Sequence, residues 1–371
     1  MRVLHFFKTY LPDTTGGVEQ VIFQLCEGTR ALGVDAEVLT LSPAPVPRQL
    51  TVGSHRVTRI REDFNLASTG FSREAFGCFA RMSREVDLIH FHFPWPFMDV
   101  VHFATRHGTP AVLSYHSDIV KQRALLQLYR PLMRRFLARM GRILVSSPNY
   151  LQSSPELEPL RERCTVVPFG LDEAAYPRPD PARLEHWRTR CGEGFFLFVG
   201  VLRYYKGLHH LLDALAGTDW PLVIVGSGPM EDELKAQAAR LGLGHVQFLG
   251  RLDDADKMCL LQLCQALVFP SHLRSEAFGI SLLEAAMCGK PMLSCEIGTG
   301  TTFVNLDGET GYTVPPADPL ALRSALQRLR TEPERTAALG RQARQRFETL
   351  FRAERMCTET LAVYREVLEG R

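Results

Sequence analysis

Several features are scarce or missing in this chain of 371 residues, and each absence argues against a class of protein. No apolar run reaches the roughly 18–20 residues that a membrane-spanning helix needs. The nine cysteines form no Cys-x-x-Cys pair, which argues against a zinc site or a disulfide framework. The 43 basic and 41 acidic residues leave a net charge of only +2, which argues against a dedicated nucleic-acid-binding protein. The first residues turn polar too soon for a signal peptide, so we expect a cytoplasmic protein with reduced thiols.

The chain does contain two series of short apolar runs, each run followed by a helical pattern. Continuous apolarity is typical of strands that are covered on both faces, as in a parallel sheet. The order therefore predicts an α/β fold with two Rossmann-like, doubly wound domains that face each other across a cleft. The expected strands are Val3–Phe7, Ala36–Leu41, Leu88–Phe93, Ala111–Tyr115, Ile143–Ser147 and Thr165–Pro168, then Phe195–Val199, Leu222–Val225, Val246–Leu249, Ala266–Phe269 and Met292–Ser294.

A proline-rich stretch separates the two series and indicates a linker. Pro177, Pro179 and Pro181 interrupt both helix and strand patterns. We therefore expect an N-terminal domain over residues 1–170 and a C-terminal domain over 171–371. The tail is helical in pattern, and we expect its last helix, near 351–371, to pack back on the N-terminal domain.

Two glycine-rich loops follow expected strands and precede expected helices. Gly16 and Gly17 lie in the first domain, and Gly226 and Gly228 lie in the second. Glycines at such a junction let the backbone approach a ligand, and a helix N-terminus favours anions. Both loops are equally compatible with a tight turn alone, and neither is the Gly-x-Gly-x-x-Gly fingerprint of a dehydrogenase.

Two cations lie just past the strand that begins the second series. Arg203 and Lys206 follow Phe195–Val199, at the strand end where open α/β sheets bind ligands. An arginine fork and a lysine point charge suit a diphosphate. Solvated surface cations are the alternative interpretation.

The segment from 270 to 291 carries the most information. Glu276 and Glu284 flank Phe278, Gly279 and Ile280 at an expected loop-to-helix junction. Eight positions are slightly more than two helical turns, so both carboxylates can share one side of the helix.

With this segment the chain resembles the family 4 glycosyltransferases, which have the GT-B fold and need no metal. The resemblance covers essentially the full length. It implies that Glu276 lies beside the donor sugar and that Glu284 holds the ribose of the nucleotide. It also implies that His116, after a first-domain strand, contacts the donor sugar. The residues that carry it are Gly16, Gly17, His116, Arg203, Lys206, Gly226, Gly228, Phe248–Gly250, Glu276 and Glu284.

A finer resemblance concerns the nucleobase. GDP-mannose-dependent mannosyltransferases of this family place an aspartate and, three residues later, a lysine near the guanine, and Asp254 and Lys257 match that spacing. A carboxylate suits guanine because N1–H and the exocyclic amine are paired donors. A solvated acidic helix start is the alternative. The segments around 270–279 and 295–305 also resemble transferases that build bacterial O-polysaccharide from GDP-mannose or GDP-D-rhamnose.

Two further histidines, His90 and His92, lie on one face of an expected strand. A metal is possible there, but packing or lining of the acceptor cleft is favoured because no carboxylate follows at ligand spacing.

The expected reaction is retaining transfer of a mannosyl or D-rhamnosyl unit from a GDP-sugar to a hydroxyl of a lipid-linked bacterial polysaccharide. The expected partners are the nucleotide-sugar donor and a polyprenyl-diphosphate-linked glycan, with neither cofactor nor metal. Arg203, Lys206, Glu276 and His116 are the expected catalytic residues. The alternatives are a transferase that uses UDP or another nucleotide, and a nucleotide-sugar epimerase of the same architecture.

One segment concentrates positive charge. Residues 121–142 contain seven basic residues and no acidic one, with apolar residues at roughly helical spacing and Pro131 inside. We expect an amphipathic helix that docks on the anionic inner face of the cytoplasmic membrane. A helix of the first domain with a solvated cationic face is the alternative.

Overall fold

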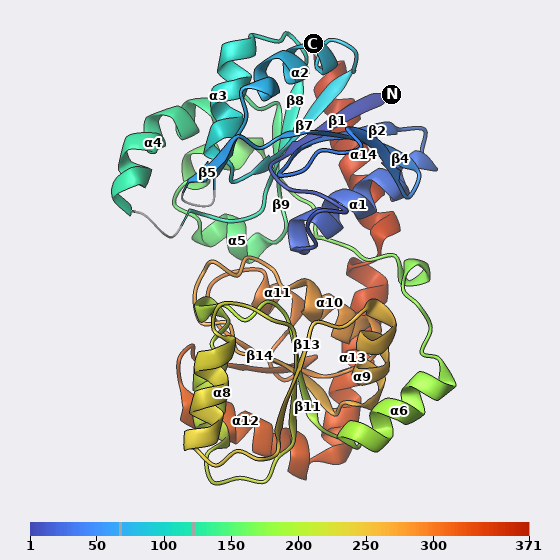
Figure 1. Ribbon diagram of the computed structural model, residues 1–371, viewed down its shortest axis with the longest axis vertical. Coiled ribbons are helices and arrows are strands. Elements are labelled where there is room, and N and C mark those ends of the chain that lie inside the picture. Colours follow the sequence, from blue (N-terminus) through green and yellow to red (C-terminus); the bar gives the residue numbers. More distant parts are fainter. Residues whose placement is uncertain (67–68, 120–122, 371) are drawn as a thin grey trace. The chain divides into compact units, whose positions relative to one another are not determined.

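The computed structural model describes residues 1–66, 69–119 and 123–370 and divides into two compact units (Figure 1). Unit 1 consists of Met1–Gly170 together with Ala353–Arg371, and unit 2 is Leu171–Arg352. The helix that follows unit 2, α14 (Ala353–Glu369), thus belongs to unit 1. No helix among the described residues combines the length and apolarity needed to cross a bilayer.

The sheet of unit 1 is parallel except for one edge strand. Its order is β10-β9-β8-β7-β1-β2-β4-β3, and only β3 pairs antiparallel, with β4. A separate hairpin consists of β5 (Phe64–Leu66) and β6 (Thr69–Phe71). The strands of the large sheet are β1 (Arg2–Phe7), β2 (Asp35–Ser42), β3 (Gln49–Val52), β4 (His55–Arg61), β7 (Leu88–Phe93), β8 (Ala111–Tyr115), β9 (Arg142–Val145) and β10 (Cys164–Val166).

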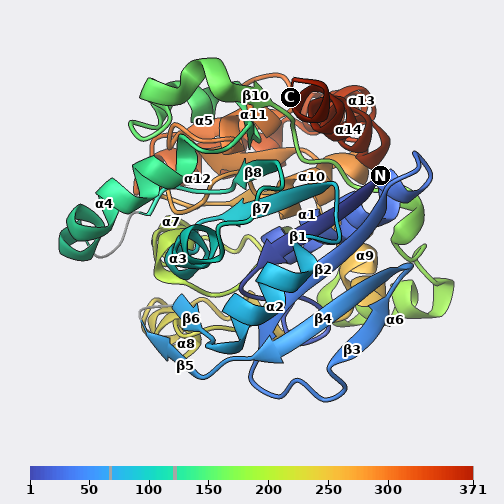
Figure 2. The ribbon, with the colours of Figure 1, turned by 90° about the horizontal axis from the view of Figure 1, so that it is seen from above.

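Helices cover both faces of this sheet. Helix α1 packs against α14, and α2 packs against α3, and Figure 2 shows these pairs on opposite sides of the sheet. This is what right-handed crossovers on the two sides of β1 produce. The helices are α1 (Gly17–Arg30), α2 (Glu74–Met82), α3 (Pro96–Thr105), α4 (Arg123–Leu137) and α5 (Pro148–Ser153), followed by the 3₁₀ turn η1 (Glu158–Arg163).

Two glycines allow α14 to approach the rest of unit 1 closely. A Cβ at Gly28 of α1 would collide with the Cys357 thiol, and one at Gly141 would lie 2.7 Å from Val367. The Tyr364 hydroxyl is hydrogen-bonded to Nδ1 of His90 at 2.6 Å. The last helix is therefore an integral layer of unit 1.

Unit 2 contains a sheet of six parallel strands in the order β13-β12-β11-β14-β15-β16. Its strands are apolar on both faces: all four residues of β12 and of β14 are buried, as expected for a sheet between two helical layers. The strands are β11 (Phe196–Val199), β12 (Leu222–Val225), β13 (Val246–Gly250), β14 (Ala266–Phe269), β15 (Met292–Cys295) and β16 (Gly311–Val314). The helical elements are η2 (Glu173–Ala175), α6 (Pro181–Cys191), η3 (Tyr204–Lys206), α7 (Leu208–Leu215), α8 (Glu231–Arg240), α9 (Asp254–Leu263), α10 (Ile280–Met287), α11 (Thr301–Val304), α12 (Pro319–Thr331) and α13 (Pro333–Leu350).

The eleven strands expected from the sequence are all present, with ends within two residues of the expected ones. Strands β3, β4, β5, β6 and β16 were not expected. The strand order reverses between β1 and β7 in unit 1 and between β11 and β14 in unit 2. In doubly wound sheets, ligands bind outside the carboxyl ends of the strands at such a reversal.

Candidate functional site

The predicted site residues of unit 2 all follow the carboxyl ends of its strands. Arg203 and Lys206 come after β11, Gly226 and Gly228 after β12, and Asp254 and Lys257 after β13. The segment from Glu276 to Glu284 comes after β14. Because β11 and β14 are neighbours at the strand-order reversal, the structure brings the first and the last of these groups together.

An ion pair joins the two neighbouring loops. Nζ of Lys206 donates to Oε2 of Glu276, although the residues are 70 positions apart. Both side chains are nearly buried, and the Ser271 hydroxyl donates to the same carboxylate oxygen at 3.4 Å. The Lys206 ammonium also lies 4.5 Å from the centre of the Phe269 ring. The pair is thus a preformed, nearly desolvated charge pair at the strand-order reversal.

Arg203 lies beside this pair on an exposed loop. It precedes the 3₁₀ turn η3 and is exposed, whereas Lys206 at the end of that turn is buried. Gly207 closes the turn with a left-handed φ of +69°, and a Cβ there would collide with the Pro270 carbonyl. Close packing of these two loops therefore requires glycine at 207.

Close backbone packing also explains the glycines at positions 226 and 228. A Cβ at Gly226 would collide with the Gly200 carbonyl oxygen, and one at Gly228 would lie 2.6 Å from the Leu202 oxygen. The loop after β12 thus packs backbone to backbone on the loop that leads to Arg203. These glycines shape the edge of the sheet whether or not they also touch a ligand.

A second charged cluster lies at α9 and α10. Nζ of Lys257 donates to Asp254 and to Glu284, at 2.7 Å in each case, and the Tyr176 hydroxyl donates to Glu284 at 3.1 Å. Burial alone would lower the pKa of Lys257, but the carboxylates of Glu284 and Asp254 outweigh it and the pKa is raised. Glu284 is nearly buried, whereas the Asp254 side chain is 63% exposed. Asp254 is therefore the carboxylate of this cluster that is open to a ligand.

The neighbouring aspartates have other partners. Asp253 caps α9 by accepting from the backbone N–H of Asp256 at 2.8 Å, and Arg183 bonds both Asp253 and Asp256. Tyr176, which bonds Glu284, was missed by the sequence analysis because it lies in the proline-rich linker.

The helix between the two glutamates begins where the sequence predicts. Gly279, with a left-handed φ of +95°, is the N-cap of α10, so Ile280 is its first residue. Phe278 is buried against the ring of Phe351 and anchors the turn. The turn thus directs the positive end of the α10 dipole toward the carboxyl edge of the sheet.

In unit 1, a carboxylate of the chain lies beside the predicted glycine loop. Gly16 is the N-cap of α1, Gly17 is its first residue, and a Cβ at Gly16 would lie 2.6 Å from the Glu19 carboxylate. Glu19 is buried and accepts from the Thr14 hydroxyl at 2.9 Å. The Glu19 carboxylate therefore lies beside the N-terminus of α1, where the helix dipole favours negative charge.

His116 is the end of a chain of buried imidazoles. Nδ1 of His5 lies 3.0 Å from Nε2 of His92, and Nδ1 of His92 lies 2.9 Å from Nε2 of His116. A neutral imidazole has one donor and one acceptor, so the tautomer of one ring sets those of the others. His90 bonds the Ser114 hydroxyl and Tyr364, which agrees with the packing role favoured for it.

These rings are held neutral. Burial lowers the pKa of His116 to about 3, and burial with the nearby His55 lowers that of His5 to about 3. The pKa values of His90 and His92 are also lowered, first by burial and then by neighbouring imidazoles, which are His5 and His116 for His90 and His90, His116 and His5 for His92. His116 therefore acts as a neutral hydrogen-bonding group near pH 7.

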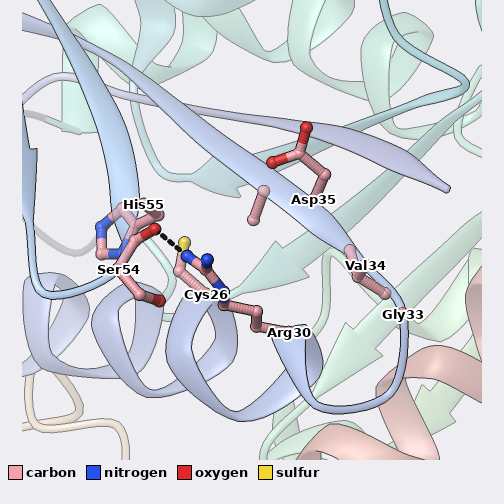
Figure 3. Close-up of a pocket in the computed structure, with 8 residues that line it drawn as sticks. Cys26, Arg30, Gly33, Val34, Asp35, Ser54 and His55 are labelled. Atoms are coloured by element: carbon pink, nitrogen blue, oxygen red, sulfur yellow. Dashed lines mark hydrogen bonds between the residues drawn. The ribbon is translucent and has the colours of Figure 1, made fainter.

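A pocket in unit 1 lies at the opposite edge of its sheet (Figure 3). Its lining includes Cys26 and Arg30 of α1, Asp35 at the start of β2 and His55 at the start of β4. The Arg30 guanidinium crosses it to donate to the Ser54 carbonyl. Because these are the amino ends of the strands, the pocket is separate from the edge where doubly wound sheets bind ligands.

The predicted basic helix is present as α4, with Pro131 inside it. Met133, Phe136 and Leu137 are buried in unit 1, whereas Arg134, Arg135 and Arg139 are exposed. Glu156 bonds Arg130 at 2.8 Å and Arg134 at 3.4 Å, which neutralises part of the charge. Lys121 lies outside the described residues.

Comparison with known proteins gives one family profile for each half of the chain. The profile described as Glycosyltransferase Family 4 matches residues 15–175, and the profile described as Glycosyl transferases group 1 matches residues 185–346.

Two curated relatives are similar over nearly their whole length. The D-rhamnosyltransferase WbpZ of Pseudomonas aeruginosa is 59% identical over 353 residues, which cover 95% of this chain and 93% of that protein. The O-antigen chain mannosyltransferase C of Escherichia coli is 47% identical over 371 residues, with 100% of both chains covered.

Solved structures share the fold at low identity. Sucrose-phosphate synthase of Thermosynechococcus elongatus has a TM-score of 0.80 at 21% identity and covers all of both chains. Anabaena HepE in complex with UDP and glucose has a TM-score of 0.78 at 20% identity and covers 99% of this chain and 100% of that one.

Proposed function

The chain belongs to the family 4 glycosyltransferases, and from this premise we propose that it transfers a mannosyl or D-rhamnosyl unit from a GDP-sugar to a lipid-linked bacterial O-polysaccharide. The GT-B fold class expected from the sequence is confirmed, and so is the assignment as a glycosyltransferase. Two relatives support the sugar and the acceptor: one is a D-rhamnosyltransferase and the other an O-antigen chain mannosyltransferase.

The observation that carries the proposed mechanism is the ion pair between Lys206 and Glu276. It joins the loops after β11 and β14, where a doubly wound sheet binds its ligand. A cation suits the departing diphosphate, and a carboxylate suits the hydroxyls of the sugar. In this proposal, Lys206 binds the diphosphate on one side of the scissile bond and Glu276 binds the sugar on the other.

Transfer breaks the anomeric C–O bond, so positive charge develops on the sugar ring and negative charge on the leaving diphosphate. In the proposed reaction, Lys206, Arg203 and the N-terminus of α10 stabilise the diphosphate without a metal. Each preorganised donor lowers the barrier by about 2–4 kcal/mol, by analogy with oxyanion holes. The configuration is retained by a front-face reaction in which the leaving phosphate oxygen takes the proton of the acceptor hydroxyl.

Glu276 must release Lys206 in part when the diphosphate binds, because the carboxylate and the diphosphate compete for the same ammonium group. The freed carboxylate then accepts hydrogen bonds from sugar hydroxyls. His116 of unit 1 contributes a neutral imidazole, which can hydrogen-bond a hydroxyl without adding charge beside a developing cation.

The nucleoside is proposed to lie at the second cluster. Glu284, held by Tyr176 and Lys257, accepts from the ribose hydroxyls. Asp254, the exposed carboxylate beside Lys257, accepts from the two donors of guanine.

A thermal-shift panel of GDP, UDP, ADP and dTDP with the full chain tests the donor. A ligand that binds the folded state raises the Tm with its concentration, and we expect the largest rise with GDP. A larger rise with UDP than with GDP would overturn the proposed donor and favour the alternative nucleotide.

An Asp254→Asn variant makes the same test at one residue. Its carboxamide presents one acceptor and one donor, so the preference for GDP over UDP should fall by about 10-fold or more. The Asp219→Asn variant, on the loop before β12, is the control. An unchanged ratio would assign Asp254 to helix capping alone.

Product analysis with and without an acceptor tests the reaction. GDP-mannose and GDP-D-rhamnose are supplied together with a polyprenyl-diphosphate-linked glycan. A transferase extends the glycan, whereas an epimerase releases an altered sugar in the absence of any acceptor. Appearance of the altered nucleotide sugar without acceptor would contradict the proposal.

A further inference from the structure

Three histidines of unit 2 gather beside the proposed diphosphate site. His209 and His210 lie in the first turn of α7, and His272 lies in the loop after β14. One ring nitrogen of each lies within 4.8 Å of one ring nitrogen of the others. The ring centres are 4.0 Å apart for His209 and His210 and about 5 Å apart for each with His272.

Local packing holds the three rings together. The backbone N–H of His272 donates to the Tyr205 carbonyl at 3.0 Å, which ties its loop to η3. The Tyr204 ring stacks on His209 at 5.1 Å, and the side chain of Gln237 donates to the His209 carbonyl at 2.9 Å. The cluster is therefore anchored on three separate segments: η3 with the start of α7, helix α8 and the loop after β14.

A second histidine group among the described residues differs from this cluster. His5, His90 and His92 are also close enough to share an ion, but they are fully buried and their nitrogens bond one another, Ser114 and Tyr364. The unit 2 cluster is only half-buried, so an ion can reach it from solvent. Among the described residues, the buried Nδ1 of His272 has no hydrogen bond of normal geometry.

We propose that His209, His210 and His272 form a binding site for a borderline-soft divalent transition metal ion such as Zn²⁺. Imidazole nitrogens suit Zn²⁺, Ni²⁺, Cu²⁺ and Co²⁺, whereas Mg²⁺ and Ca²⁺ prefer oxygen ligands. Three protein ligands leave a fourth position for water, so the site is open rather than closed.

The surroundings favour a cation. The carboxylates of Asp213 and Glu233 lie near enough to His209 to favour positive charge there. Lys206, which ends the neighbouring turn η3, is already paired with Glu276. Burial and the neighbouring imidazoles lower the pKa of His272 to about 4, so protons do not compete with a metal ion near pH 7.

Binding requires a modest contraction. Zn–N bonds of about 2.0–2.1 Å in a tetrahedral site place ligand nitrogens about 3.3–3.4 Å apart. Half-buried side chains can close the remaining distance by rotation of χ1 and χ2. The ion would then hold the start of α7 and the loop after β14 together.

Calorimetric titration of the full chain with ZnCl₂, CoCl₂ and MgCl₂ tests this site without reference to enzyme activity. We expect one Zn²⁺ or Co²⁺ per chain and no comparable binding of Mg²⁺. His272→Asn, and separately His209→Asn, should weaken Zn²⁺ binding by at least about 10-fold. The control is His186→Asn, since His186 is an exposed histidine of α6 outside the cluster.

Two further measurements keep the test decisive. Thermal unfolding without metal establishes that each variant is folded, and Zn²⁺ should raise the Tm of the parent and of His186→Asn but not of His272→Asn. The spectrum of the Co²⁺ protein separates imidazole ligands from the nine cysteines by the absence of a sulfur-to-metal band. Parent-like Zn²⁺ affinity in both cluster variants, or a sulfur-to-metal band, would overturn the proposal.

Discussion

At the scale of single residues, the charge pair of Lys206 and Glu276 and its neighbour Arg203 lead to the sharpest test of the proposed chemistry. Lys206→Ala and Arg203→Ala should each lower kcat by about 10²–10³, because their charges matter most as the diphosphate departs. Steady-state kinetics with GDP-mannose measures the effect. Arg188→Ala on α6 is a matched cation elsewhere in unit 2. Turnover within about threefold of the parent in both variants would remove these residues from the site.

Variants of Glu276 and Glu284 should have different effects, because the two residues are proposed to bind different parts of the donor. Glu276→Gln should lower kcat strongly yet leave GDP affinity unchanged or improved, since Lys206 is then free to meet the diphosphate. Glu284→Gln should weaken GDP binding by about 10-fold or more, because it loses a charged acceptor.

Calorimetry with GDP measures both, and Glu185→Gln on the surface of α6 is the control. An equal loss of GDP affinity in the Glu276 and Glu284 variants would refute the division of roles.

Sequence reasoning identified the members of these pairs but not the pairs themselves. Lys206 and Glu276 were found through their motifs, and only the strand order shows that their loops are neighbours. Tyr176 and the three clustered histidines were not identified from the sequence. The partner of Tyr176, Glu284, is 108 residues away, and His209 and His210 meet His272 only because its loop lies beside α7. The Glu19 carboxylate beside Gly16 was also not anticipated, although it lies only three residues further along the chain.

At the scale of elements, α4 combines a buried apolar face with an exposed basic one. The Tyr129 hydroxyl donates to Asp99 of α3, so the apolar face is fixed within unit 1. Leu128 is 82% exposed on the outer part of the helix, beside the cationic residues. We expect binding to phosphatidylglycerol vesicles at low salt that fades as salt rises, as measured by flotation.

Replacing Arg134, Arg135 and Arg139 with glutamine should abolish flotation and leave GDP binding intact. The charge-matched control replaces Arg190, Arg240 and Arg330, three exposed arginines of unit 2. Flotation lost equally in both triple variants would mean that net charge, rather than α4, drives membrane binding. A parent protein that stays in the soluble fraction at low salt would leave α4 as a packing helix.

The strands that the sequence did not predict are those without a continuous apolar run. Strand β4 carries three arginines, and its buried Arg59 bonds Asp13 at 2.8 Å, 46 residues earlier, as well as Ser42 and Ala44. Strand β16 has four residues and a glycine start. Continuous apolar runs such as β12 and β14 were found, because burial on both faces leaves no other composition possible.

At the scale of the whole molecule, neutral buried histidines should make unit 1 sensitive to acid. His5 and His116 have pKa values lowered to about 3, and His102, by burial and the nearby His107, to about 4. The unfolded chain takes up these protons near pH 6.5, whereas the folded chain does not, so stability falls as pH drops below 6.5. Each histidine contributes about 1.4 kcal/mol per pH unit between pH 6 and its folded pKa.

Urea unfolding at several pH values between 7.5 and 4.5 measures this slope. Trp95 is the one tryptophan of unit 1, so its emission in a Trp187→Phe, Trp220→Phe background reports that unit. His116→Asn should reduce the pH dependence of the free energy of unfolding by an amount equal to the uptake of about one proton. The control variant His186→Asn should not reduce it. A pH-independent free energy of unfolding over this range would contradict the neutral, buried state of the imidazole chain.

The place of α14 has a consequence for how the protein is made. Because synthesis runs from residue 1 onward, the whole of unit 2 leaves the ribosome before the helix that completes unit 1. Until then, the surface around Gly28 and Gly141 and the imidazole of His90 lack their partners Cys357, Val367 and Tyr364. The nascent chain therefore lacks these contacts throughout the translation of unit 2, and unit 1 can complete its packing only after the residues from 353 onward have emerged.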